Sequence, residues 1–553
     1  MKTAPLIPKS ISAKFTNAVR PQFIAAWNLP ALNHFRFRAL LVAFILSACF
    51  IRAYVGLWGS RIYTQDAFSI LDGAWRVLNG QKPHIDFYTG LGPLIYLMTA
   101  AGVAIAHGNA VGLAYGQALF GCLAGLWAFC LSQKRLRGLG AMLVPVVVAL
   151  LTIVPINIGE WPDAITPGGI YNRCGYALLS LLMIESCASA RSDPKSSEFC
   201  GGLSTGAVLG MLLFLKMSFF MGAIFLLAVL LPLRSQTRQR WYGMGAAFCI
   251  TVLAFLCYLS FDLAAVYIDL RTVAHAKHVM VGWYLVKDVV VCAFPFLLLV
   301  HLISRGVVSR REYHAIRVAG LGVCLAGLFL LMTSWQFFAL PLDSVMAILL
   351  LERVLPQTMQ LQNSPLPRLS PLLLGALFAI NFIASQGAGL SYALSQKLHQ
   401  TPHTSFTAPA LLGFNSTAET DYVKHVNEGC QLLDEHRRPL DTVLALNFTN
   451  PFSFGLGMKP PAGGTTWLQY HTDFDEDGPS PERVFGSASL VMLPKSFSDR
   501  TLPDTVPRIY EPFLKAHYVL AAESRNWWLY RRKHTDAGGA VATFNKASAA
   551  VRR

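Results

Sequence analysis

The acidic side chains near the start of this chain are placed in a way that favours acid–base chemistry. Asp66 is the first acid, and Asp72 and Asp86 are the next two. A carboxylate held against a membrane surface can act as a general base, whereas the alternative is an ordinary solvated loop acid. On one helix Asp66 and Asp72 would point about 120° apart. Asp66 and Asp86 form the better pair, because the Gly and Pro residues between them let the chain fold back.

Two histidines have a spacing that can serve a metal ion. His275 and His278 lie three residues apart, which would allow both to ligate zinc from one helix face. No third ligand is evident in the sequence around them. We therefore interpret them as ordinary surface residues.

The composition requires that most of the chain lies in a membrane. Of its 553 residues, 54% are hydrophobic and only 14% are charged, whereas soluble domains are about 25% charged. This excludes a cytosolic enzyme, a secreted disulfide scaffold and a disordered protein. Most of the 11 cysteines lie in apolar runs and none has a CxxC spacing. They are typical of small buried hydrophobic residues.

The net charge of +16 follows from where the basic residues fall between apolar segments. The apolar runs of spanning length are 39–58, 110–131, 139–157, 174–190, two short runs within 201–233, 242–260, 279–303, 318–335, 340–356 and 371–394. The basic connectors are 134–137, 191–195, 234–240, 305–317 and 353–368. The positive-inside rule predicts that all of them are cytoplasmic, so nucleic acid is not needed to explain the charge.

One further apolar run, 92–107, conflicts with this arrangement of membrane spans. If it crossed the membrane, every later basic connector would move to the outside. Its 16 residues are fewer than the ~20 that a spanning helix needs. We therefore interpret it as an interfacial or re-entrant helix. This gives eleven spans, with the N-terminus inside and the C-terminus outside.

The predicted architecture is a polytopic α-helical membrane protein of about 11 spans with a C-terminal periplasmic α/β domain. Its parts are a basic cytoplasmic N-terminus (1–38), a transmembrane domain (39–394) with outer loops 59–109, 158–173 and 261–280, the periplasmic α/β domain (395–533) and a disordered tail (534–553). In the α/β domain the pattern predicts strands at Thr442–Leu446, Ser489–Leu493, Tyr518–Ala522 and Trp528–Arg531, and helices at Glu419–Arg437 and Pro507–Lys515.

The first outer loop resembles that of a known superfamily. Asp66 is followed by Pro83-His-Ile-Asp86-Phe-Tyr88 and then by Gly92-Pro93-Leu94-Ile-Tyr96. This order is similar to the first periplasmic loop of the GT-C glycosyltransferases, which use polyprenyl-phosphate sugars. They include protein O-mannosyltransferases, oligosaccharyltransferases and the aminoarabinose transferase that modifies lipid A. The resemblance implies a GT-C-like fold, with Asp66 as catalytic base and Asp86 as a supporting acid.

The resemblance has one departure, which concerns the donor phosphate. The aminoarabinose transferases carry a Lys where this chain has Gly92, so another cation must meet the phosphate. We expect Lys216, Lys287 and Arg271 to bind it, because ionisable groups at membrane depth are functional candidates by default. The alternative for each is a side chain that reaches from an apolar segment to water.

Other site residues follow from the same resemblance. It implies that four residues line the substrate pocket, namely Tyr88, Tyr96, Trp161 and Gln336. Oligosaccharyltransferases carry acids in their second loop for a metal. Glu160 and Asp163 would supply carboxylate oxygens for a divalent cation here, and a solvated turn is the alternative.

We therefore expect a multi-pass glycosyltransferase of the bacterial inner (cytoplasmic) membrane. It would move a hexosyl or pentosyl group from a polyprenyl-phosphate donor to a periplasmic or lipid-linked acceptor (a glycan, lipid or protein), with inversion. A divalent cation is the one cofactor that the pattern leaves open. The alternatives are a transporter or flippase of a lipid-linked glycan, or a non-catalytic protein of envelope assembly. The spans are mostly Leu, Val, Ala and Phe at their centres, which disfavours a transport path.

Overall fold

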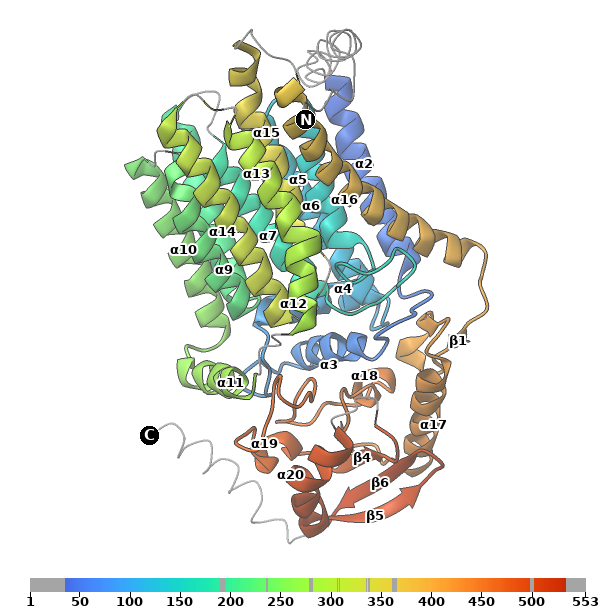
Figure 1. Cartoon of the computed structure of the whole chain (residues 1–553). Helices are drawn as coiled ribbons and strands as arrows, with labels where there is room; N and C mark the ends of the chain where they lie inside the picture. Colours follow the sequence, from blue (N-terminus) through green and yellow to red (C-terminus); the bar gives the residue numbers. More distant parts are fainter. Residues whose placement is uncertain are drawn as a thin grey trace, which may run out of the picture.

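The computed structural model describes residues 35–533, apart from 189–193, 235–236, 278–281, 306, 308, 335, 337–338, 361–365 and 498–501. The tail expected at 534–553, and nearly all of the basic N-terminus 1–38, lie outside the described residues. The described chain forms a large helical part with a smaller α/β domain packed against one end of it (Figure 1).

The helical part follows the apolar runs of the sequence. Its helices are α2 (Phe35–Val55), α3 (Asp66–Leu78), α4 (Pro93–Ile105), α5 (Gly112–Arg135), α6 (Gly138–Ile153), α7 (Ile170–Cys187), α8 (Pro194–Leu213), α9 (Met217–Leu230), α10 (Arg238–Tyr258), α11 (Leu263–Ala276), α12 (Trp283–Asp288), α13 (Phe294–Arg305), α14 (Arg310–Ser334), α15 (Pro341–Gln360) and α16 (Leu366–Leu398). Among the described residues, 6 helices are long and apolar enough to cross a membrane, and four further apolar helices are shorter. The total of eleven spans stays a prediction.

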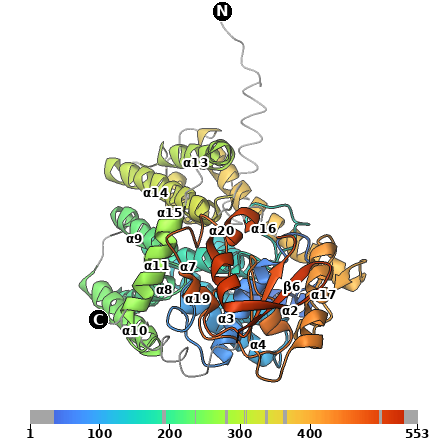
Figure 2. The same ribbon diagram turned by 90° about the horizontal axis from the view of Figure 1, so that it is seen from below.

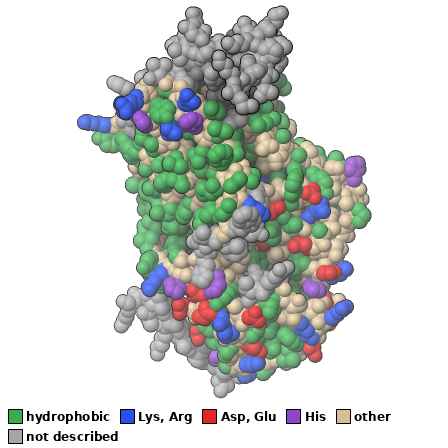
Figure 3. All heavy atoms as spheres, viewed as in Figure 1, with side chains coloured by type: hydrophobic (Ala, Val, Ile, Leu, Met, Phe, Trp, Pro, Cys, Tyr) green, Lys and Arg blue, Asp and Glu red, His purple; other side chains and the backbone are tan. Residues whose placement is uncertain are grey.

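The described parts of the basic connectors lie at one end of the helical part (Figure 1). Their arginines form ion pairs with glutamates: Arg135 and Arg240 with Glu185 (2.6 and 3.0 Å), Arg234 with Glu198, and Arg353 with Glu312 (2.7 Å). The backbone N of Arg137 also donates a hydrogen bond to Glu352 Oε1 (2.7 Å). The start of α2 lies at this end and the α/β domain at the other (Figure 1). In the space-filling view, Lys and Arg mark this end, and hydrophobic side chains cover the middle (Figure 3). That this end faces the cytoplasm, as the positive-inside pattern indicates, stays a prediction.

Helix α4 is formed by the apolar run 92–107, which conflicted with the predicted arrangement of spans. It has 13 residues, or about 20 Å at 1.5 Å per residue, which is less than the ~30 Å of the hydrocarbon core. It packs closely on α5, since a Cβ atom on Gly102 would lie 2.1 Å from the Gly112 oxygen. The interfacial interpretation of this segment stays a prediction, because α6 and α9 are also short.

A four-stranded mixed sheet forms the centre of the α/β domain. The order is β3 (Val443–Ala445), β4 (Leu490–Pro494), β6 (Trp527–Arg532) and β5 (Tyr518–Glu523), with β3 and β4 parallel and the other pairs antiparallel. The side chains of β3 alternate: Val443 and Ala445 share a core with α17 (Thr420–His436), whereas Leu444 packs with α20 (Leu502–His517). A strand or helix is present at each of the six positions that the pattern indicates. The domain covers α3 and α4 and leaves α13 and α14 to one side (Figure 2).

Short elements complete the domain and its connection to the helices. They are β1 (Thr404–Ser405), β2 (Asn415–Ser416), α18 (Phe452–Gly455) and α19 (Pro481–Phe485). The domain is held to the first loop by Arg76 of α3. Its Nη1 donates to the backbone oxygens of Pro461 (2.9 Å) and Gly463 (2.7 Å), and its Nε pairs with Asp72 (2.7 Å). Both side chains of this ion pair are fully buried, so the loop and the domain form one packed unit.

Candidate active site

A cavity of about 480 Å³ lies where the helical part meets the α/β domain. Its walls come from α3, the second loop, the α8–α9 junction, the end of α11, the end of α14 and the domain segment 448–473. The polar and charged residues of the lining include Asp66, Asn157, Asn172, Lys216, Lys277, Thr333, Ser334, Gln469 and Asp473. Its volume falls in the range of known small-molecule sites, about 300–1,000 Å³.

Asp66 is the first residue of α3 and lines the cavity. The second loop approaches it closely, because a Cβ atom on Gly168 would lie 2.6 Å from Asp66 Oδ2. Burial raises the pKa of Asp66, with a smaller contribution from the Glu419 carboxylate, and brings it from 3.8 to about 7. A general base is most effective when its pKa lies near the working pH. The environment of Asp66 therefore suits proton transfer.

Lys216 also lines the cavity, at the N-cap of α9. Its Nζ donates to Asn172 Oδ1 (3.1 Å) and Ser334 Oγ (3.0 Å) and lies 4.9 Å from the centre of the Tyr171 ring. These partners are neutral. Within the described residues no carboxylate forms an ion pair with Lys216. Burial lowers the pKa of Lys216 well below 10.5, with a smaller contribution from Lys277, so an anion bound beside its Nζ atom would favour the charged form.

Lys277 is a second ammonium group in the same cavity. It follows α11 directly, and its Nζ donates to the backbone oxygen of Thr333. Burial lowers the pKa of Lys277 from 10.5 to about 8. Lys216 is close enough to interact with it electrostatically. Two cations held near one another, with no ion pair to either among the described residues, form a site for a multiply charged anion.

The first-loop acids do not share a site. Asp86 Oδ2 accepts a hydrogen bond from Lys82 N (2.7 Å), which closes a turn within the loop, and Asp86 does not line the cavity. Asp72 is paired with Arg76. The expected pairing of Asp66 with Asp86 is thus not found, because the turn that folds the chain back uses the Asp86 carboxylate itself.

Tyr88 and Tyr96 lie behind the cavity wall. The Tyr88 hydroxyl donates to the backbone oxygen of Asp473, which lines the cavity. The Tyr96 hydroxyl is 2.7 Å from Thr89 Oγ1 and 3.2 Å from Thr466 Oγ1. Both tyrosines are buried. They hold the domain segment in place and do not themselves line the cavity.

Four other expected site residues do not line the cavity. Gln336 is buried and its Nε2 donates to Asn157 Oδ1 (3.3 Å), so it contacts a lining residue. Trp161 is 78% exposed. Arg271 is exposed on α11, and Lys287 is half-buried in α12. Neither of these two cations reaches the cavity lining.

The second-loop acids lie outside the cavity as well. Asp163 Oδ2 pairs with Arg61 Nη1 at 2.7 Å, and both side chains are partly exposed. Neither Glu160 nor Asp163 is a lining residue. The geometry therefore gives these carboxylates no contact with a substrate in the cavity. His278 lies outside the described residues.

Two residues of the site were missed in the sequence. Lys277 stands between an amphipathic run and the next apolar run, a position like that of Lys216, so the same criterion could have found it. Glu419 acts on Asp66 from the α/β domain, and its Oε2 accepts a hydrogen bond from Thr64 N (2.7 Å). Nothing in its local sequence indicates this contact.

Comparisons with known proteins give resemblance in structure and none in sequence. No family model matches the chain, and no curated protein matches it. A crystal structure of ArnT from Cupriavidus metallidurans bound to undecaprenyl phosphate is 12% identical, with a TM-score of 0.49, covering 90% of this chain and 98% of that one. The archaeal oligosaccharyltransferase AglB from Archaeoglobus fulgidus is 12% identical, with a TM-score of 0.41, covering 92% of this chain and 76% of that one.

Proposed function

We propose that this protein is a membrane glycosyltransferase that takes a sugar from a polyprenyl-phosphate donor and transfers it to a hydroxyl group outside the cytoplasm. The observation that carries the proposal is the pairing, in one cavity, of a carboxylate whose pKa is near 7 with two half-buried ammonium groups. A sugar phosphate needs this combination, because the acceptor must lose a proton while the leaving phosphate gains charge.

The phosphate of the donor would lie between Lys216 and Lys277. Both cations are held by neutral oxygens, Lys216 by Asn172 and Ser334 and Lys277 by the Thr333 carbonyl. An ammonium group bonded to neutral acceptors can bind phosphate without first breaking an ion pair. The position at the end of the apolar helices suits a lipid whose chain stays in the membrane. Lys216 and Lys277 would take the role of the Lys that the aminoarabinose transferases carry where this chain has Gly92.

Asp66 would act on the acceptor. Its carboxylate takes the proton of the acceptor hydroxyl while that oxygen bonds to the anomeric carbon, and the bond from that carbon to the phosphate oxygen breaks. The electron pair leaves with the phosphate, where the two ammonium groups stabilise it. A single displacement of this kind inverts the anomeric centre. The transition state resembles an oxocarbenium ion, as in glycoside hydrolysis.

The acceptor would approach from the α/β domain. A second cavity of about 340 Å³ lies beside the first, and Gln65 lines both. Its lining includes the carboxylates of Glu419 and Asp421 and the rings of Tyr422 and Trp527. Carboxylates and aromatic rings can hold the hydroxyl groups and apolar faces of a glycan.

The test is a transfer assay in membranes that contain a labelled polyprenyl-phosphate sugar. Asp66→Asn keeps the side-chain shape but cannot accept a proton, so transfer should fall about 10²–10⁴-fold. Binding of a fluorescent polyprenyl phosphate should persist. Asp434→Asn is a matched control, because Asp434 lies on an exposed face of α17 and pairs with Arg437.

Two results would contradict the proposal. Full transfer in Asp66→Asn would remove the base assignment. The protein would instead be a transporter if the parent gave no transfer product but moved a lipid-linked glycan across the membrane, and if Asp66→Asn moved it equally well. Localisation is tested with a reporter that is active only outside the cytoplasm, which should be silent after Gly138 and active after Lys397.

A further inference from the structure

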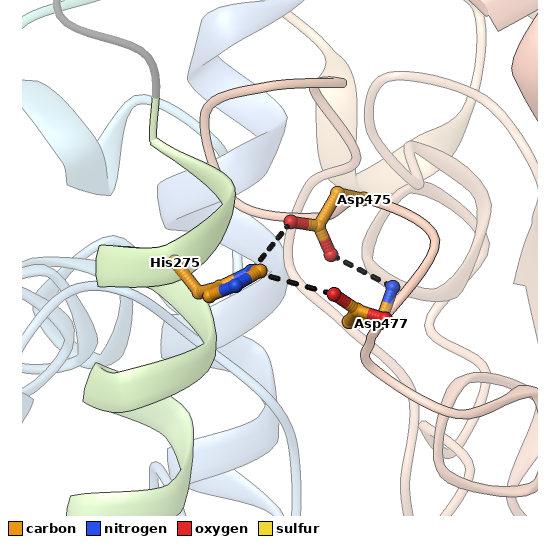
Figure 4. Close-up of side chains that lie close together, drawn as sticks. All are labelled: His275, Asp475 and Asp477. Carbon is orange, nitrogen blue, oxygen red and sulfur yellow. Dashed lines mark hydrogen bonds and ion pairs between the residues drawn. The ribbon is translucent and has the colours of Figure 1, made fainter.

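A histidine of α11 and two aspartates of the α/β domain come together beside the cavity. Figure 4 shows His275 on α11 facing Asp475 and Asp477, which lie about 200 residues later in the chain. The Nδ1 atom of His275 is 3.2 Å from Asp475 Oδ2 and 3.6 Å from Asp477 Oδ2. One ligand atom from each residue lies within 4.8 Å of the others. The sequence around His275 offered no such partners.

The separations fit the coordination shell of a small metal ion. In a tetrahedral zinc site with ligands at 2.0–2.2 Å, neighbouring ligand atoms are about 3.3–3.6 Å apart. The two separations from His275 are close to this range. An ion could therefore take its place among these atoms with small side-chain movements. The nitrogen–oxygen ligand set is one that zinc accepts.

The aspartate turn is arranged before any ion arrives. Asp475 is buried, its Oδ1 accepts a hydrogen bond from Asp477 N (2.9 Å), and its backbone N donates to Gly478 O (3.1 Å). Its Oδ2 is thereby directed at His275. His275 and Asp477 are 67% and 77% exposed, so water has access to the fourth position. Two carboxylates beside one imidazole leave a negative charge, which favours a cation.

We propose that His275, Asp475 and Asp477 bind a divalent transition-metal ion of the zinc class, and that this ion fastens α11 to the α/β domain. His275 is two residues before Lys277, and Asp475 is two residues after Asp473; both of these neighbours line the cavity. The ion would therefore fix two cavity walls to one another. Its effect on the donor phosphate rests on the proposed function, whereas the binding of metal does not.

The test measures metal on the purified full chain in detergent. After treatment with a chelator and titration with Zn²⁺, the parent protein should bind one ion per chain and unfold at a higher temperature. Titration with Co²⁺ should give the visible absorption of a tetrahedral site. His275→Gln and Asp475→Asn should each lose the ion, the absorption and the thermal shift. His399→Gln is the matched control, because His399 is an exposed histidine that follows α16.

Absence of Co²⁺ absorption and of a zinc-induced shift in the parent protein would overturn the proposal and leave a His–Asp ion pair. Retention of both in His275→Gln would place the metal elsewhere and overturn the assignment. Neither readout uses transfer activity, so the glycosyltransferase proposal can fail while the metal site stands. If Zn²⁺ binds at this site without changing the unfolding temperature, the fastening role is wrong.

Discussion

Both ends of the helical part hold charged side chains that are at least partly shielded from water, but only at one end are these charges paired. At the end with the basic connectors, Glu185 lies 2.6 Å from Arg135 and 3.0 Å from Arg240, with all three side chains buried. At the end that carries the α/β domain, Asp66 and Lys216 face one cavity, and in the described residues neither has an ion-pair partner. Paired buried charges satisfy one another, whereas the unpaired ones have shifted pKa values, which are typical of functional sites.

The largest effect that separates the two ends is on stability. Glu185→Gln leaves Arg135 and Arg240 without their shared carboxylate, and breaking such a buried pair typically costs about 3–5 kcal/mol. We expect a lower unfolding temperature and lower yield in membranes. Asp66→Asn should not reduce the unfolding temperature, because no ion pair is broken. Thermal unfolding of the two variants in detergent checks this, and equal destabilisation would erase the distinction between the ends.

The next effect is on binding of the carrier phosphate. Lys216→Gln removes a charge-assisted hydrogen bond, worth about 1.5–3 kcal/mol, so affinity for a fluorescent polyprenyl phosphate should fall about 10–100-fold. Lys277→Gln should act in the same direction. Lys424→Gln is the control, since Lys424 is an exposed residue that pairs with Asp421. Unchanged affinity in both cavity variants would mean that the phosphate binds elsewhere.

The pH dependence of kcat/KM sharpens the comparison further. Asp66 must be ionised, and its pKa is about 7, so activity should rise as the pH increases through 7. Lys277 must be protonated, and its pKa is about 8, so activity should fall above 8. The profile should be bell-shaped. In Glu419→Gln the nearby negative charge is lost, the pKa of Asp66 falls, and the acidic limb should move to lower pH. If the acidic limb stays in place, Glu419 does not raise the pKa of Asp66.

The same shift of Asp66 has a consequence for stability. Its carboxyl group has a higher pKa in the folded protein than the 3.8 of an exposed one, so the fold favours the protonated form. The contribution of Asp66 to stability is full below pH 4 and is lost as the pH rises to about 7. In Asp66→Asn the free energy of unfolding should not show this decrease between pH 4 and about 7.

The smallest effect is expected in the second loop. Asp163 and Arg61 form a partly exposed ion pair, and such pairs contribute about 0–1 kcal/mol. Asp163→Asn and Glu160→Gln should leave both transfer and unfolding temperature close to those of the parent. Loss of transfer in these variants, together with inhibition by a chelator, would show that the second loop holds a catalytic metal after all.

Local features could be predicted from the sequence, whereas contacts between residues far apart in the chain could not. Apolar runs mark the helices, and alternating residues mark the strands of the domain, because both patterns depend on neighbours in the chain. Lys216 could be selected because it interrupts an apolar run. Glu419 could not, since it reaches Asp66 from more than 350 residues away. Asp86 was paired with the wrong partner because a turn formed by its own carboxylate leaves no periodic signal.

The contact between Arg76 and the carbonyl oxygens of Pro461 and Gly463 spans more than 380 residues, and this sets an order of events during synthesis. Arg76 leaves the ribosome long before the backbone groups that it binds exist. The cavity lacks its domain wall, including Gln469 and Asp473, until the final quarter of the chain has been translated and translocated. Long-range contacts of this kind form late. A chain still being made in the membrane therefore has Asp66, Lys216 and Lys277 but no closed cavity. If the proposed function is right, it can bind a lipid-linked substrate only after the segment 448–473 has been added.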